Sequence, residues 1–177
     1  MPRKTLKDVF IHLLSETYSA EKQLVRALPK MSRVATNPAL AAVFTSHLEE
    51  TRGQVDRIDR VVESCQIKLK RMKCVAMEGL VEEAQEVIDE IEKGPVLDAA
   101  LIAAAQKVEH YEIASYGTLA ELAKQLGFLE AQLILGQTLQ EEVGADRKLT
   151  RLAEGGVNEE ALEAPDAAAG ASADATA

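Results

Sequence analysis

Apolar side chains recur at steps of three and four residues along four long stretches of the chain, the spacing that places them on one face of a helix. In the first stretch this repeat passes through Leu6, Phe10, Leu13, Leu24 and Leu28. The pattern predicts long helices over residues 5–35, 38–65, 96–126 and 128–153, and a shorter helix over residues 75–91. Proline starts helices well and glycine ends them, so the turns are expected at Asn37-Pro38, Gly94-Pro95 and Gly127.

The lengths of the joins predict how these helices are arranged. Two or three residues join the first long helix to the second, and the third to the fourth, so each pair is expected to form an antiparallel hairpin. A much longer segment that includes the shorter helix joins the two hairpins. We therefore predict an all-α fold, a ferritin-like antiparallel four-helix bundle with a crossover helix between helices two and three. The bundle is expected over residues 1–154, and the Ala-rich, acidic residues 155–177 are expected to form a disordered tail.

Composition narrows the class of protein. Of the 177 residues, 47% are hydrophobic and 28% are charged, which suits a folded core, and the 3% aromatic content argues against an all-β fold. The net charge of −9 makes nucleic acid a poor partner. Two cysteines are too few for a disulfide scaffold, and the sequence has neither a membrane-spanning apolar run nor a signal-peptide apolar region. We expect a cytoplasmic protein that binds neither nucleic acid nor membranes.

Polar residues interrupt the apolar face of each long helix, where a bundle core is expected to be apolar. The expected inward faces carry six carboxylates and one histidine: Glu21, His47, Glu50, Glu109, Glu112, Glu142 and Asp146. Those on the second, third and fourth long helices are paired at spacings of three or four residues, which keep both side chains on one face.

These carboxylates are also predicted to lie at one height in the bundle. Glu21 and Glu50 are about equally far from the first turn, and the same holds for Glu112 and Glu142 about the second turn. A single glutamate of this kind is more typical of a solvated helix face. Six in one core would repel one another unless they were protonated or bound to cations. Two divalent ions would relieve the repulsion, and oxygen ligands with one nitrogen suit iron or manganese, so we predict two bound iron ions, with manganese as the other candidate.

Five segments carry a resemblance to a known family: SETYSAEKQL, HLEET, KRMKCVAMEGL, AAQKVEHYEIASYGTL and LQEEVGADRKLTRLA. They resemble the YciF-like family of ferritin-like bacterial stress-response proteins, and the match runs from about residue 6 to residue 153. The resemblance implies a bundle with a di-metal centre related to that of rubrerythrin. In that centre Glu21 would be the ligand of the first helix, Glu50 and Glu142 would bridge the metal ions, and Glu109 and Glu112 would form an ExxE pair.

The chain departs from the rubrerythrin pattern in two places. The usual ExxH order is absent from the second helix, because Gly53 follows Glu50 at the third position and His47 precedes it. Asp146 stands where rubrerythrin-like proteins have a histidine. The expected site is therefore unusually rich in carboxylates, which leaves iron and manganese both open. No four-cysteine module is present, so no built-in electron donor of that kind is expected.

Several neighbouring residues have two interpretations. His110, Tyr18 and Tyr116 could join the metal site or orient its ligands, although each residue type is more often a packing or interhelical contact. The basic segment with Lys68, Lys70, Arg71 and Lys73 is more simply a solvated loop, and the alternative is a patch for phosphate or a partner.

Two functions are consistent with the expected centre. The first is a ferroxidase-like or peroxidase-like enzyme in which Fe(II) reacts with O₂ or H₂O₂ as the small-molecule oxidant. The second is a non-catalytic module with a structural metal, which dimerises or binds a partner through Val81, Val87, Ile88 and Ile91 of the shorter helix. Mineral storage is a weaker third possibility because it needs a closed cage of many subunits. We expect the protein to be a homodimer.

Overall fold

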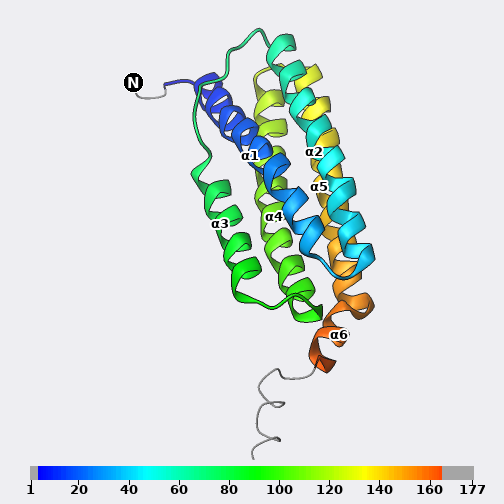
Figure 1. Ribbon diagram of the computed structural model, residues 1–177. Coiled ribbons are helices and arrows are strands. Elements are labelled where there is room, and N and C mark those ends of the chain that lie inside the picture. Colours follow the sequence, from blue (N-terminus) through cyan, green and yellow to red (C-terminus); the bar gives the residue numbers. More distant parts are fainter. Residues whose placement is uncertain (1–3, 165–177) are drawn as a thin grey trace, which may run out of the picture.

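The computed structural model describes residues 4–164, and all the regular secondary structure in this range is helical (Figure 1). The helices are α1 (Leu6–Val34), α2 (Pro38–Ser64), α3 (Val75–Glu90), α4 (Pro95–Gln125), α5 (Leu129–Leu152) and α6 (Asn158–Glu163), with a π-helical turn (Ala153–Val157) before α6. The prediction of an all-α helical bundle is confirmed.

Four long helices lie side by side and form the body of the molecule (Figure 1). Helix α1 packs against α2, and α4 packs against α5, as expected for two hairpins with short turns. The hairpins meet where α2 contacts α5 and where α1 contacts α4. Helix α3 lies outside this body, against α1 and α4 (Figure 1).

Local sequence signals explain where the first hairpin begins and turns. Thr5 and Asp8 form a capping box in which the Thr5 hydroxyl accepts from the Asp8 amide at 3.1 Å and the Asp8 carboxylate accepts from the Thr5 amide at 3.1 Å. Asn37 caps α2 through its side-chain oxygen, and Pro38 occupies the first helical position. The first backbone amides of a helix have no partner within it, and these capping side chains supply one.

The apolar core is divided into two clusters. One contains Leu24, Phe44, Leu101 and Leu149, and the other contains Phe10, Ile58, Leu119 and Leu135. Apart from Asp98 near the start of α4, the buried polar residues of the four long helices lie along the chain in the stretches where one cluster gives way to the other. The buried polar residues of this middle layer include Glu21, His47, Thr51, Gln54, Glu109, Glu112, Thr138 and Glu142. The bundle therefore consists of two apolar ends and one polar layer.

The buried carboxylate of Asp98 joins the two hairpins at one end of the bundle. Asp98 lies in the first turn of α4, and its oxygens accept hydrogen bonds from the amides of Thr36 and Asn37, each at 2.8 Å. The Thr36 hydroxyl also donates to Asp98. The turn between α1 and α2 is thus attached to the start of α4.

The connector between α2 and α3 is held along α1. Ser15 and Ser19 are one helical turn apart on α1, and their hydroxyls accept from the amides of Lys70 and Cys74, each at 2.9 Å. The apolar side chains that we considered as a partner surface, Val81, Val87 and Ile88 of α3 and Ile91 directly after it, are partly buried against the core. They cover the bundle in this structure.

The end of the chain differs from the prediction of a tail that is disordered from residue 155. The chain remains ordered past residue 155: it kinks at Gly156, Asn158–Glu163 form α6, which packs against α4, and Val157 is buried in the core. The Gly155-Gly156 pair does not end the structure, because Gly156 adopts φ 129°, a conformation open to glycine, and lets the chain turn back onto the bundle. The rest of the predicted tail, residues 165–177, lies outside the described residues. Within residues 4–164, no helix combines the length and apolar character needed to cross a membrane.

Candidate metal centre

Four buried side chains from three helices meet in the polar layer. They are His47 of α2, Glu109 and Glu112 of α4, and Glu142 of α5, and they offer ligand atoms that all lie within 4.8 Å of one another. Glu112 and Glu142 are completely excluded from solvent. Three carboxylates and one imidazole so close together form a group that could hold a metal ion.

His47 lies among carboxylates on both sides of its ring. Its Nε2 atom is 3.3 Å from Glu109 Oε1 and 3.8 Å from Glu142 Oε2, and its Nδ1 atom is 3.3 Å from Glu50 Oε2. An ionised carboxylate can only accept a hydrogen bond, so Nδ1 carries the proton in the contact with Glu50. Nε2, which faces Glu109 and Glu142, is then the ring atom that could bind a metal ion after losing its proton.

Many of the buried carboxylate oxygens have no hydrogen-bond donor. Both oxygens of Glu112 and one oxygen each of Glu21, Glu109 and Glu142 are buried without a hydrogen-bond partner among the described residues. A buried acceptor without a partner is costly, and a buried charge more so. The layer therefore requires protons or cations that the protein side chains do not supply.

The pKa values of these groups also indicate that the polar layer needs protons or cations. Burial is the largest cause, and it raises the pKa of Glu109 to about 8 and that of Glu142 to about 7. Burial, followed by repulsion from Glu21 and Glu142, raises the pKa of Glu112 well above its usual value. For His47, burial alone would lower the pKa, but attraction to Glu109 and the other nearby carboxylates outweighs it and raises the pKa to about 9.

Glu21 lies in the same layer but outside the group of four. The Tyr116 hydroxyl donates a hydrogen bond to its Oε1 atom, while its Oε2 atom is unpaired. Burial raises the pKa of Glu21 to about 7, against the opposing effect of the Tyr116 hydrogen bond. Tyr116, which the sequence left as either a packing residue or a member of the site, thus holds one of the predicted ligands in place. Tyr18 instead lies at the edge of the core, beneath the ammonium group of Lys22.

Glu50 stands at the edge of the group, with 29% of its side chain exposed. One oxygen faces His47, and the other accepts from Lys148 Nζ at 3.1 Å. These two contacts, with the His47 hydrogen bond the largest cause, lower the pKa of Glu50. The structure therefore places Glu50 where it orients His47, beside the group rather than within it.

Asp146 is not brought into the group of four. Its Oδ1 atom accepts from Gln106 Nε2 at 3.2 Å and lies 3.4 Å from Nε2 of His110, whose side chain is 69% exposed. Asp146 and His110 therefore form a pair on the surface between α4 and α5. Of the seven residues predicted as ligands, four meet, Glu21 and Glu50 flank them, and Asp146 lies further out.

Three residues that contact the site, Gln54, Arg57 and Lys148, were not predicted from the sequence as parts of it. The Gln54 amide donates to Glu142 and, at 3.3 Å, to Glu141. Arg57 also pairs with Glu141, so a polar chain runs from Glu142 to the surface of α2. Gln54 falls on the inward face of α2 and could have been found by its spacing. Lys148 could not, because its contact with Glu50 joins two hairpins far apart in the sequence.

The fold and this site define the class of protein: an all-helical bundle with a buried group of carboxylates and one histidine that could hold a metal ion. The chain belongs to a family described as a domain of unknown function, DUF892, which matches residues 5–162. The expected resemblance to the YciF-like family is thereby confirmed, since Protein YciF of Escherichia coli K12 is 65% identical over 162 residues, covering 91% of this chain and 98% of YciF.

Solved structures agree with this assignment. The crystal structure of the E. coli stress protein YciF matches with a TM-score of 0.86 at 65% identity, over 89% of this chain and 99% of that one. YcfI of Rhodopseudomonas palustris matches with a TM-score of 0.80 at 46% identity, over 83% and 94% of the two chains. A protein from Xanthomonas campestris shares the fold, with a TM-score of 0.68 at 21% identity over 87% and 94% of the chains.

Proposed function

We propose that this chain is a stress-response protein with a ferritin-like bundle that binds two iron ions, or manganese, in its polar layer and oxidises Fe(II) or consumes peroxide there. The observation that carries the proposal is the set of unpaired buried carboxylate oxygens beside His47. The stress-response setting rests on the 65% identity to a protein described as a stress protein of E. coli. We further propose that it works in the cytoplasm, with O₂ or H₂O₂ as the oxidant.

The donor set fits iron or manganese better than zinc or calcium. Zinc sites favour tetrahedral sulfur and nitrogen ligands, and calcium sites use oxygen ligands alone. Here Glu109, Glu112 and Glu142 would supply oxygen ligands and His47 a nitrogen ligand, with Glu21 as a further carboxylate in the same layer. Bound iron would supply electrons for the reduction of O₂ or H₂O₂.

The protein's own residues prepare this chemistry in three ways. Glu50 accepts the Nδ1 proton of His47 and so leaves Nε2 free to bind. Tyr116 and Gln54 donate to Glu21 and Glu142 and hold these two carboxylates in one orientation. The two apolar clusters above and below the layer exclude water, which strengthens the attraction between the carboxylates and a cation.

The direct test is an anaerobic titration of the metal-free protein with Fe(II), followed by admission of peroxide. We expect saturation near two irons per chain and rapid growth of the near-ultraviolet absorbance of ferric iron. Glu142→Ala should lose iron binding while keeping its helical circular dichroism. Glu49→Ala, which removes an exposed carboxylate of α2, is the matched control.

Two results would overturn the proposal in different ways. If Glu142→Ala retained the full amount of metal, the polar layer would not be the binding site. If the wild-type protein bound iron but peroxide left it ferrous, the metal would be structural and the non-catalytic interpretation would take its place.

A further inference from the structure

A second candidate site lies on the outside of the bundle, where the connector between α2 and α3 crosses α1. A groove of about 660 Å³ opens there. Its charged lining residues are all cations: Lys22, Arg26, Lys70, Arg71 and Lys73. Five cations without a carboxylate contrast with the whole chain, which has 20 basic and 29 acidic residues. The groove therefore concentrates positive charge on an acidic protein.

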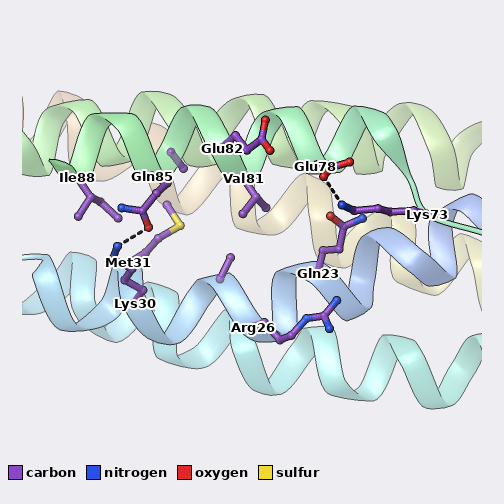
Figure 2. A pocket seen from close by; sticks show the side chains of 12 residues that line it. Gln23, Arg26, Lys30, Met31, Lys73, Glu78, Val81, Glu82, Gln85 and Ile88 are labelled. Atoms are coloured by element: carbon purple, nitrogen blue, oxygen red, sulfur yellow. Dashed lines mark hydrogen bonds and ion pairs between the residues drawn. The ribbon is translucent and has the colours of Figure 1, made fainter. Parts of the chain in front are cut away.

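An adjoining groove of about 410 Å³ between α1 and α3 shares Arg26 and Lys73 with the first (Figure 2). Its cations are largely matched by partners on α3. Figure 2 shows Lys73 joined to Glu78 and Lys30 joined to Gln85, whereas Arg26 has no marked contact. Lys73 and Lys30 thus have partners on α3, and Lys30 also pairs with Asp89. Beneath the connector the cations form no such pair with a described residue, although the charge of Lys70 acts on the Asp8 carboxylate and Asp56 lines a neighbouring pocket with Lys22 and Arg26.

The cations beneath the connector have few partners of their own. Among residues 4–164, the side chains of Arg26, Lys70 and Arg71 make no hydrogen bond or ion pair, and Lys22 only lies over the ring of Tyr18, 5.0 Å from its centre. Other surface cations of this protein do form ion pairs, as Arg52 does with Glu49 and Lys107 with Glu83. The guanidinium and ammonium donors of this groove are free to bind a ligand.

The fold holds these cations together before any ligand arrives. Ser15 and Ser19 accept from the amides at both ends of the segment 70–74, and the Gln23 amide donates to the Cys74 carbonyl oxygen at 3.0 Å. The backbone that carries Arg71 is therefore fixed to α1, which carries Arg26. Like charges gathered in this way repel one another, and a bound anion would relieve that repulsion with little further loss of chain entropy.

We propose that this groove binds an oligophosphate, a ligand with two or more linked phosphate groups. Arginine side chains bind phosphate oxygens through two parallel hydrogen bonds, and lysines add point charges. A triphosphate carries about four negative charges at neutral pH, which matches the four unpaired cations Lys22, Arg26, Lys70 and Arg71. A single phosphate would contact and neutralise only some of these four cations. The volume of the groove also suits a ligand of nucleotide size.

Isothermal titration calorimetry of the full chain at low salt tests the proposal with three probes: sodium tripolyphosphate, ATP and inorganic phosphate. We expect tripolyphosphate to bind once per chain and at least about tenfold more tightly than inorganic phosphate. Arg26→Gln and Arg71→Gln should each weaken this binding by about tenfold, because each loses a charge-assisted contact. Arg151→Gln, at an exposed position on α5, is the matched control and should leave the binding unchanged.

Each outcome decides the matter. Equal binding of tripolyphosphate to wild type, Arg26→Gln and Arg71→Gln would overturn the proposal, as would binding that disappears after treatment with a chelator, since that would place the phosphate on a metal ion. ATP bound more tightly than tripolyphosphate would support the site and identify a nucleotide as its ligand. Equal affinity for both would support it and assign recognition to the phosphate chain alone. Thermal melts of all variants check that the groove substitutions leave the fold intact.

Discussion

The hydrogen bond from Tyr116 to Glu21 joins residues 95 positions apart and satisfies one oxygen of a fully buried carboxylate. Both partners lie inside the bundle, so neither can exchange the lost contact for one with water. An acceptor that loses its donor in such a place costs more than the same contact would at the surface. Removal of the Tyr116 hydroxyl alone should therefore change the free energy of unfolding measurably.

We therefore expect Tyr116→Phe to lower the free energy of unfolding of the metal-free protein by about 1–3 kcal/mol. Tyr18→Phe is the control, because the Tyr18 hydroxyl makes no hydrogen bond with a described residue. Urea unfolding followed by circular dichroism measures both. Equal stability of wild type and Tyr116→Phe would show that the hydroxyl is not needed to satisfy Glu21.

Stability should also depend on pH through the buried groups of the polar layer. The pKa values of Glu21 and Glu109 are raised from 4.5 to about 7 and about 8, and that of His47 is raised from 6.5 to about 9. A group whose pKa is higher in the folded than in the unfolded state binds more protons when folded, so it stabilises the fold at low pH. That stability is fully present below the unfolded pKa and is lost as the pH rises through the folded pKa.

The free energy of unfolding of the metal-free protein should thus fall between about pH 5 and about pH 9, by about 3 kcal/mol for one carboxyl group shifted as Glu21 is. Urea unfolding in the presence of a chelator, repeated across this range, gives the slope. Glu112→Gln removes one of the groups with a raised pKa and should give a shallower slope. Stability that stays constant or increases over the range would show that these carboxyl groups ionise as freely in the fold as in the unfolded chain.

Single residues also show what spacing in the sequence can and cannot reveal. Spacing placed His47, Glu109, Glu112 and Glu142 on inward faces at one height, and the structure brings these four together. It placed Asp146 with them, but one further turn along α5 takes Asp146 to Gln106 and His110. Two residues on one face at a spacing of three or four need not both point to the centre. Which of the two does so depends on the rotation of the helix, which its neighbours decide.

At the scale of whole elements, the turn between α1 and α2 depends on a residue from another hairpin. Asp98 accepts two backbone hydrogen bonds and one from the Thr36 hydroxyl. Its carboxylate thus supplies acceptors for the donors that the turn exposes. The sequence indicated the turn itself through Asn37-Pro38, because capping is local. It did not indicate Asp98, whose partners are more than sixty residues away.

Asp98→Asn should weaken this attachment, because an amide offers one acceptor oxygen where the carboxylate offers two. We expect a loss of about 2–3 kcal/mol in the free energy of unfolding, typical of charged hydrogen bonds made in a buried place. Asp89→Asn, on an exposed part of α3, is the control. Chemical denaturation of both variants measures the difference, and equal losses would contradict a specific role for Asp98.

The end of the bundle was mispredicted for the same reason, since local signals do not reveal distant contacts. Glycine pairs often end helices, so the sequence predicted that order stops at residue 155. Whether the chain leaves the bundle or returns to it depends on the residues after the glycine pair, and here the buried Val157 brings α6 back against α4. The hydrophobic periodicity of a helix as short as α6 is too brief to read from sequence.

At the scale of the whole molecule, two exposed leucines lie close together on the surface. Leu129 and Leu133 are one turn apart on α5 and are 65% and 75% exposed. Exposed apolar side chains that adjoin one another can form part of a contact between chains. They support our proposal that the protein is a homodimer, now with α5 as the contact in place of α3.

Leu133→Lys should therefore convert a dimer into a monomer at the same protein concentration. Size-exclusion chromatography with light scattering would measure a mass near 19.2 kDa per particle for the variant and twice that for the wild type. Leu162→Lys, on the short α6, is the control at another exposed leucine. A wild-type mass of one chain would contradict the homodimer, and an unchanged mass for Leu133→Lys would place its contact elsewhere.

The division of the polar layer between the two hairpins has a consequence for assembly. The first hairpin supplies His47, and the second supplies Glu109, Glu112 and Glu142, so neither half of the chain contains the group alone. A metal ion bound there would be a cross-link between the two halves of the molecule. Its binding would oppose their separation, and it would also hold α4 against α5 within the second hairpin. With metal bound, the two hairpins should unfold together. In the metal-free protein, one hairpin can separate from the other before either unfolds.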